Sequence, residues 1–194
     1  MGSVLPPIER PRGLLMRIAY AASKRQYGVV LSVLKVIYAR KPSLALVARK
    51  ILSAQNKLTL ELPLRALIQV QVSRLNGCRF CEDIRLATAY QERVGAERFL
   101  ALESASTSPL FTAREKAALA LTAEATTQRK VSEATWREAQ RHFSETELVE
   151  IVWLNASENY FNLQAAVLGI ESDGLAEPFD KLRAIGKFSA RAKP

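Results

Sequence analysis

Apolar residues recur every three or four positions along most of the chain, a spacing typical of helices that bury one face. No segment alternates apolar and polar residues convincingly with a period of two, so the pattern predicts no β-sheet. We therefore expect an all-α protein in which Pro, Gly, Ser and Thr mark the helix ends. The predicted helices cover residues 14–27, 29–39, 42–55, 63–75, 78–94, 96–103, 113–125, 132–142 and 145–168.

Local signals mark several of these helix starts. Pro42 and Pro63 stand where a first helical residue is expected, because proline has no N–H group to leave unpaired there. Thr112-Ala-Arg-Glu115 and Ser144-Glu-Thr-Glu147 are capping boxes, in which a hydroxyl and a carboxylate satisfy free N–H groups of the first turn. Each signal supports a helix that begins within the turn that follows.

The chain length and the apolar content suit one domain with a real core, because 194 residues with 48% apolar side chains can bury enough surface. Residues 1–12 contain three prolines and are expected to form an extended arm. We expect residues 13–170 to form a single helical domain. Residues 171–194, which are rich in turn-forming and basic residues, are expected to form a C-terminal tail.

The first and last helices carry informative faces. One side of the first helix is formed by Leu15, Ile18 and Ala22. A polar stripe on the last helix consists of Asn155, Glu158, Asn159 and Asn162. This stripe is either the solvent face of the helix or the polar lining of a pocket or subunit interface. The apolar residues of 145–168 surround more of the helix than one neighbour covers, so we expect a homo-oligomer.

The net charge of +9 comes from the N-terminal third of the chain. Residues 1–60 contain eleven Lys and Arg against one acid, whereas residues 61–194 contain seventeen against eighteen. Such asymmetry fits an anionic partner such as nucleic acid or a membrane surface. The basic residues are spread singly, which favours the alternative of an ordinary solvated face. No membrane-spanning run is present, and Arg17 interrupts the best signal-peptide candidate, so we expect a cytoplasmic protein.

Both cysteines of the chain lie in one motif, Cys78-x-x-Cys81, directly after the helix-breaking pair Asn76-Gly77. In a helix that starts at Cys78, the two cysteines and Arg85 share one face. The helix dipole and the guanidinium favour thiolate, so we expect at least one thiol to have a pKa below the free value of about 8.5. The second cysteine can then capture the oxidised first sulfur as a disulfide, which is a redox cycle.

Three other interpretations of the cysteine pair are weaker. Both cysteines could be small core residues, because free cysteine is often buried. A structural zinc ion needs four ligands, and the cysteines plus His142, the only histidine, fall short, so we expect no metal. A thioredoxin-like protein would need alternating strands and helices, which the pattern does not show. With no further cysteine in the chain, we favour a redox site.

Several motifs in order resemble the carboxymuconolactone decarboxylase family, and specifically its alkyl hydroperoxidase D-like branch with a Cys-x-x-Cys pair. The resemblance covers roughly residues 35–170 and rests on residues 64–81, 142–147, 159–162 and 168–169. It implies an all-helical bundle, a homo-oligomer, and peroxide reduction in which the second cysteine attacks and the first resolves. The helix dipole instead favours Cys78 as the more acidic thiol, so the order within the pair stays open.

The sequence departs from this family at the proton relay. The branch carries a glutamate twelve residues before the first cysteine and a histidine four after the second, where this chain has Ala66 and Arg85. Neither residue can act as a base at neutral pH. The family's arginine after the second asparagine is Leu163 here. We expect a catalytic set of Cys78, Cys81 and Arg85, supported by Glu82, Asp83, Asn159 and Asn162, with Glu82 or Asp83 as the base.

The sequence thus predicts a cysteine-based oxidoreductase that reduces a peroxide or a disulfide, takes electrons from a thiol reductant protein and needs no cofactor. One alternative is a non-catalytic helical oligomer that binds an anionic partner through its basic N-terminal third. Another is an enzyme resembling the lactone decarboxylases. That branch does not depend on a cysteine pair, so Cys78 and Cys81 argue against it.

Overall fold

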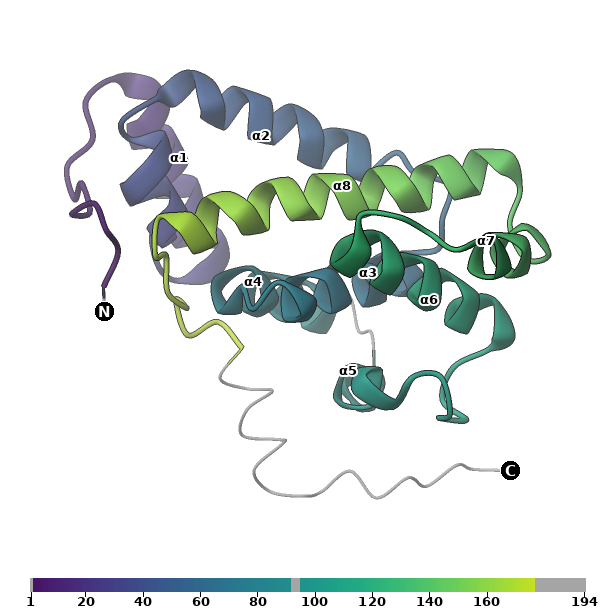
Figure 1. Cartoon of the computed structure of the whole chain (residues 1–194). Coiled ribbons are helices and arrows are strands. Elements are labelled where there is room, and N and C mark those ends of the chain that lie inside the picture. Colours follow the sequence, from purple (N-terminus) through teal and green to yellow (C-terminus); the bar gives the residue numbers. More distant parts are fainter. Residues whose placement is uncertain (1, 92–94, 177–194) are drawn as a thin grey trace.

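The computed structural model describes residues 2–91 and 95–176, which form helices without any strand (Figure 1). The predicted all-α class is therefore confirmed, and most predicted helices match observed ones within a few residues. The α-helices are α1 (Leu14–Tyr27), α2 (Pro42–Gln55), α3 (Leu62–Leu75), α4 (Arg79–Gln91), α5 (Ala96–Leu100), α6 (Ala113–Gln128), α7 (Glu133–Gln140) and α8 (Glu145–Val167).

The helix starts follow the local signals in the sequence. Pro42 and Pro63 lie in the first turns of α2 and α3. Both predicted capping boxes form: at the start of α6, the Glu115 N–H donates to the Thr112 hydroxyl and the Thr112 N–H donates to the Glu115 carboxylate, at 3.2 and 2.9 Å. The same reciprocal pair joins Ser144 and Glu147 at the start of α8.

The helix predicted over residues 29–39 is shorter than expected, and its regular part is a π-helical segment, Leu34–Tyr38. The Ser23 hydroxyl explains the late start. It donates to the Val29 carbonyl at 2.9 Å and accepts from the Leu31 N–H at 3.0 Å. These backbone groups are satisfied by a side chain of α1, so they need no helical partners.

Helix α3 lies at the centre of the molecule and packs against α4, α6 and α8. One side of α3, which includes Leu67 and Val70, joins a core with α4, α5 and α6. The other side, which includes Ile68 and Val72, joins a core with α6, α7 and α8. A third core contains both cysteines together with residues of α1, α2 and the end of α8. The cysteine pair therefore lies where the N-terminal helices meet the central bundle.

The apolar side of α1 that the sequence analysis named does not face the core. Its residues, Leu15, Ile18 and Ala22, are exposed to solvent. Met16 and Tyr20 are buried instead, and the Tyr20 hydroxyl donates to the Ile8 carbonyl at 2.6 Å. Both sides of this helix carry apolar residues, so periodicity alone could not choose between them. The exposed side leaves Ile18 with 58% of its surface accessible in the single chain.

Segments outside the helices bind to the end of the bundle. The described residues before α1 form no helix, and the Val4 N–H donates to the Leu168 carbonyl at 3.0 Å. After α8, the Asp173 carboxylate accepts from the N–H and hydroxyl of Ser32 at 2.8 and 2.6 Å. Residues 177–194, most of the predicted tail, lie outside the described residues. Within the described residues, no helix is long and apolar enough to cross a membrane.

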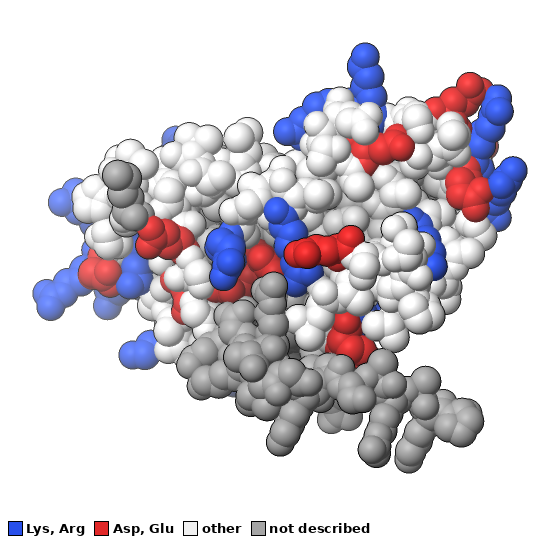
Figure 2. All heavy atoms as spheres, turned by 60° about the horizontal axis from the view of Figure 1, so that its bottom comes forward, with Lys and Arg blue, Asp and Glu red and all other residues white. Residues whose placement is uncertain are grey.

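Charged side chains of both signs are interspersed on the face shown in Figure 2. Some basic residues of the N-terminal third are engaged within the chain. Lys35 pairs with Glu9 at 3.0 Å, and the Arg40 guanidinium donates to the carbonyls of Val36 and Pro6 at 2.7 and 2.6 Å. The charges of Lys35 and Arg40 are therefore partly used within the chain.

Candidate functional site

The cysteine motif begins at the turn between α3 and α4. Gly77 adopts a left-handed conformation with φ 65°, which a glycine accepts without a steric penalty. The turn is closed by a hydrogen bond of 2.9 Å from the Cys78 N–H to the Ser73 carbonyl. Helix α4 begins at Arg79, and the Glu82 N–H donates to the Cys78 carbonyl at 2.9 Å. Cys78 therefore caps α4, and Cys81 lies in its first turn, as the spacing predicted.

The two sulfurs are joined as a disulfide, with the Cα atoms 5.3 Å apart. The Cys81 N–H also donates to the Cys78 sulfur at 3.3 Å, so a backbone amide at the helix start points at that sulfur. Both cysteines are buried, with 4% and 5% of their surface exposed. Both cysteines are thus core residues as well as a disulfide pair. They differ in whether they line a cavity.

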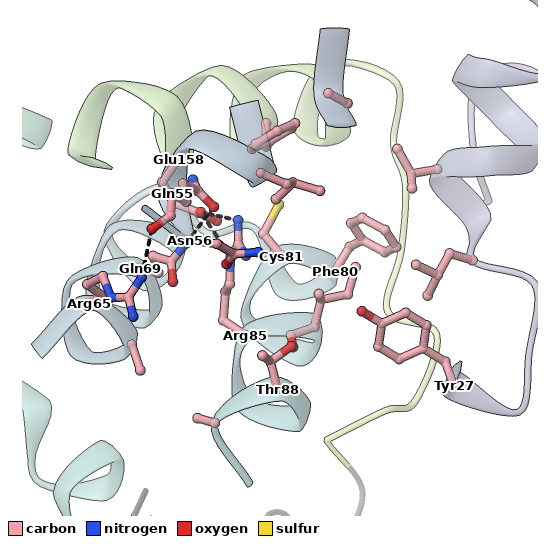
Figure 3. A pocket seen from close by; sticks show the side chains of 18 of the residues that line it. Tyr27, Gln55, Asn56, Arg65, Gln69, Phe80, Cys81, Arg85, Thr88 and Glu158 are labelled. Atoms are coloured by element: carbon pink, nitrogen blue, oxygen red, sulfur yellow. Dashed lines mark hydrogen bonds and ion pairs between the residues drawn. The ribbon is translucent and has the colours of Figure 1, made fainter. Parts of the chain in front are cut away.

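A cavity of about 380 Å³ lies beside Cys81, which is one of its lining residues, whereas Cys78 is not (Figure 3). The volume falls within the range typical of small-molecule sites. Most of the lining is apolar and includes Ile37, Phe80 and Phe161. The polar part of the lining consists mainly of Tyr27, Tyr38, Gln55, Asn56, Arg65, Gln69, Arg85, Thr88, Glu158 and Gln164.

Arg85 lines the same cavity one helical turn after Cys81, but it is not an isolated positive charge. Its Nε and Nη2 both donate to one carboxylate oxygen of Glu158, at 2.9 and 2.6 Å. The Glu158 side chain is 1% exposed and that of Arg85 is 13% exposed, so this is a buried ion pair. The sequence predicted a guanidinium beside the thiols, but it did not predict the carboxylate that neutralises it.

Glu158 is held by groups from three helices. Its other carboxylate oxygen accepts from the Ser73 hydroxyl of α3 and from the Asn162 amide of α8, both at 3.2 Å. The Asn76 amide, which ends α3 just before the cysteines, donates to the side-chain oxygens of Asn159 and Asn162 at 2.9 and 3.0 Å. A polar network therefore joins the turn before Cys78 to the carboxylate behind Arg85.

This network decides how the polar stripe of α8 is used. Asn155, Glu158 and Asn162 are buried, so the interpretation of the stripe as a solvent face is wrong. Glu158 contributes to the cavity lining, which was the alternative. Asn155 instead donates to the Thr122 carbonyl and the Thr126 hydroxyl of α6, at 3.2 and 2.7 Å. Within the stripe, Glu158 thus lines the cavity, whereas Asn155 binds α8 to α6.

Glu82 and Asp83 do not face this cavity, although the sequence suggested one of them as a base. The Glu82 carboxylate pairs with Arg74 Nε at 2.7 Å. Asp83 is buried and accepts a hydrogen bond from the Ser172 hydroxyl. The helical rotation of 100° per residue turns both side chains away from the face of Cys81. The carboxylate beside the cysteine pair comes from Glu158, far away in the sequence.

Two positions at which this chain departs from the family lie in different surroundings, one in the cavity and one on the surface. Ala66 lies in the cavity lining, so the place of the family's glutamate is filled only by a methyl group. Leu163, where the family has an arginine, is 66% exposed on α8. Burial raises the pKa of Tyr38 to about 12, with a smaller contribution from Tyr160, so its phenol is not a base near neutral pH. No group of acidic, His and Cys side chains suited to a metal ion occurs in residues 2–91 and 95–176.

The model of the carboxymuconolactone decarboxylase family matches residues 47–124, which contain α3, the cysteine pair and α4. Through this segment, the chain is similar to the carboxymuconolactone decarboxylase family. The chain is also 27% identical over 107 residues to the uncharacterized protein YdfG of Bacillus subtilis (strain 168). That match covers 54% of this chain and 73% of YdfG.

Solved structures show the same helical fold. The debrominase Bmp8, determined in complex with 2,3,4-tribromopyrrole, has a TM-score of 0.80 at 18% identity, and the match covers 94% of this chain and 98% of Bmp8. A peroxidase-related protein from Ralstonia eutropha JMP134, described as an alkylhydroperoxidase AhpD core, has a TM-score of 0.69 at 19% identity, covering 90% and 95% of the two chains. The chain therefore has the AhpD-like fold.

Proposed function

We propose that this protein is a cysteine-based oxidoreductase that reduces a peroxide through Cys78 and Cys81. The observation that carries the proposal is the place of Cys81 on a cavity of small-molecule size, with its resolving partner already within disulfide reach. The match of residues 47–124 to the family model and the AhpD-like fold support it. The asymmetry between the cysteines favours Cys81 as the attacking residue, because its side chain is the one that meets the cavity.

The chemistry balances with two electrons. In the reduced protein, the Cys81 thiolate attacks one peroxide oxygen, the O–O bond breaks, and Cys81 becomes a sulfenic acid. The departing alkoxide takes up a proton through solvent and leaves as an alcohol. The Cys78 thiol then attacks the Cys81 sulfur and expels water, which gives the observed disulfide pairing. A dithiol reductant protein returns two electrons and two protons and releases both thiols.

Arg85 acts in this scheme as a fixed hydrogen-bond donor and not as an acid or base. Glu158 accepts from its Nε and Nη2, which holds the guanidinium plane against α8. Its remaining donors have no other partner among the described residues, so they can stabilise charge on Cys81 or on the leaving oxygen. Because the ion pair is nearly neutral as a whole, this stabilisation is smaller than that from an isolated arginine. We therefore expect slow oxidation compared with a site that has a histidine relay.

A second candidate is reductive dehalogenation of an aromatic ring. The apolar and aromatic lining beside Cys81, with Phe80 and Phe161, suits such a ring. In this reaction, Cys81 would take the halogen from carbon, a proton would replace it on the ring, and Cys78 would expel halide to form the same disulfide. The products differ: released bromide indicates this reaction, and an alcohol indicates peroxide reduction.

The test is disulfide formation in the fully reduced protein. The protein is mixed with hydrogen peroxide, cumene hydroperoxide or a brominated pyrrole, remaining thiols are alkylated, and mass spectrometry locates any Cys78–Cys81 disulfide. We expect one hydroperoxide equivalent to yield one disulfide and one alcohol, with turnover when a dithiol is supplied. A Cys78→Ser variant controls for non-specific oxidation, because it cannot form the intramolecular bond. If both thiols stay fully alkylatable with excess peroxide, the proposal is wrong.

A further inference from the structure

One basic residue of the cavity has no counter-charge among the residues that the structure describes. Arg65, on α3, is part of the lining, and its Nη1 donates to the Gln55 carbonyl at the end of α2, at 2.7 Å. Its Nε is buried without a hydrogen-bond partner among the described residues. A buried donor that lacks a partner is destabilising. The hydrogen bond to the Gln55 carbonyl therefore holds the Arg65 side chain in place, but it does not neutralise the positive charge.

Other partly buried arginines of the described chain are treated differently. Four of them each form an ion pair with a carboxylate. The side chains of these four arginines are between 13% and 27% exposed. These pairs are Arg74–Glu82, Arg85–Glu158, Arg98–Glu115 and Arg114–Glu147. Arg65 is half-buried as well but has no such ion pair in residues 2–91 and 95–176. Its lack of an acid is thus specific to the cavity wall.

The charge of the cavity follows from its ionisable groups. Arg85 and Glu158 cancel each other, and burial keeps the Tyr38 phenol neutral by raising its pKa to about 12. Arg65 remains, so the lining carries one net positive charge. Figure 3 shows Arg65 beside Gln55 and Gln69 at one side of the cavity, with Phe80 and Tyr27 toward the other and Cys81 between them. The cavity therefore has a cationic polar end and an apolar end.

We propose that this cavity binds an amphipathic organic acid, with its carboxylate at Arg65 and its apolar body along Phe80. A carboxylate would accept from the Nη hydrogens of Arg65 that the Gln55 carbonyl leaves unused, and charge-assisted hydrogen bonds of this kind are stronger than neutral ones. The side chains of Gln55 and Gln69, which are joined by a hydrogen bond of 3.3 Å, offer further polar contacts at the same end. This inference rests on the proposed function only in naming the reacting molecule as a hydroperoxide that carries a carboxylate.

Binding of an unreactive probe tests the site without any chemistry. Calorimetry compares octanoate with octanamide, which has the same chain but no charge, on the full chain with the disulfide intact. We expect octanoate to bind at least about tenfold more tightly, since a hydrogen bond to a charged group contributes roughly 1.5–3 kcal/mol. In Arg65→Met, this preference should disappear. The matched control is Arg141→Met, which removes an exposed positive charge on the surface and should keep the preference.

The outcomes separate the inference from the proposed function. Equal binding of octanoate and octanamide, no binding of either, or an unchanged preference in Arg65→Met would overturn the carboxylate site, whatever the redox activity. Where the reduced protein does react with hydroperoxides, the ratio of kcat/KM for a carboxylated hydroperoxide to that for its methyl ester should fall about tenfold or more in Arg65→Met. A preference for octanoate without any peroxide reaction supports this site and contradicts peroxide reduction.

Discussion

At the scale of single residues, the Arg85–Glu158 pair is the feature that separates this site from a histidine relay. A buried guanidinium next to the cysteine pair requires a carboxylate, because an unpaired buried charge is costly. Glu158 supplies it from α8 and is itself held by Ser73 and Asn162. The pair therefore links the stability of the core to the geometry of the site.

Glu158→Gln should destabilise the protein. The substitution leaves the Arg85 charge buried without its partner, and breaking such a pair from one side costs about 3–5 kcal/mol. Chemical denaturation measures this loss in the free energy of unfolding. Glu133→Gln is the matched control, because its pair with Arg137 is exposed, with side-chain accessibilities of 77% and 69%, and should cost less than about 1 kcal/mol. Equal losses in the two variants would show that the Arg85–Glu158 pair is not structurally important.

Arg85→His should increase the rate of peroxide oxidation. An imidazole at this position, one turn from Cys81, can accept and return a proton, which arginine cannot. General acid–base assistance is typically worth about a hundredfold or more. Arg85→Gln serves as the comparison, because it also breaks the ion pair with Glu158 but adds no proton carrier. If the folded histidine variant reacts no faster than the glutamine variant, the missing relay does not limit the reaction.

At the scale of helices, the sequence predicted the helix bounds, because these depend on residues close by in the chain. The bounds of α1 and α2 match the prediction, because Gly28 and Pro42 act on the backbone next to them. The link between Arg85 and Glu158 depends on how α4 and α8 pack, and these residues are 73 positions apart. Periodicity could place Glu158 in a polar stripe, yet it could not say that the stripe turns inward. The lone acid among the three asparagines was the available signal.

The helix starts also couple stability to pH. Burial raises the pKa of Glu115, but hydrogen bonds from the Thr112 N–H and from Arg98 outweigh it and lower the pKa below 4.5. A carboxyl group with a depressed folded pKa adds stability that is present above its unfolded pKa and lost as the pH falls through the folded value. Glu115→Gln should therefore show a shallower decrease in the free energy of unfolding between about pH 7 and about pH 3. An identical decrease in parent and variant would contradict this assignment.

At the scale of the whole molecule, α8 presents an apolar stripe that the single chain leaves uncovered. Its exposed residues are Val149, Val152, Ala156, Leu163 and Val167. Their spacing places them on one side of the helix. This stripe and the exposed side of α1 are the surfaces that a second copy would cover. The proposal of a homo-oligomer therefore rests on defined helices.

Light scattering tests the homo-oligomer directly. We expect a mass that is a multiple of the 21.5 kDa of one chain at micromolar concentration. Val152→Glu combined with Leu163→Glu should shift the protein toward the monomer, because burying carboxylates in an interface is costly. Glu103→Gln, on the exposed 3₁₀ turn after α5, is the control that should keep the parent mass. A monomeric parent protein would contradict the proposal.

The central claim is that Cys81 attacks the substrate from the cavity and Cys78 resolves the product. The most direct measurement is sulfenic-acid trapping with dimedone in the two single-cysteine variants after exposure to a hydroperoxide, with mass spectrometry to locate the adduct. We expect Cys78→Ser to accumulate the adduct on Cys81, because the resolving thiol is absent, and Cys81→Ser to remain largely unmodified. An adduct on Cys78 in Cys81→Ser, together with an unreactive Cys81 in Cys78→Ser, would contradict the account.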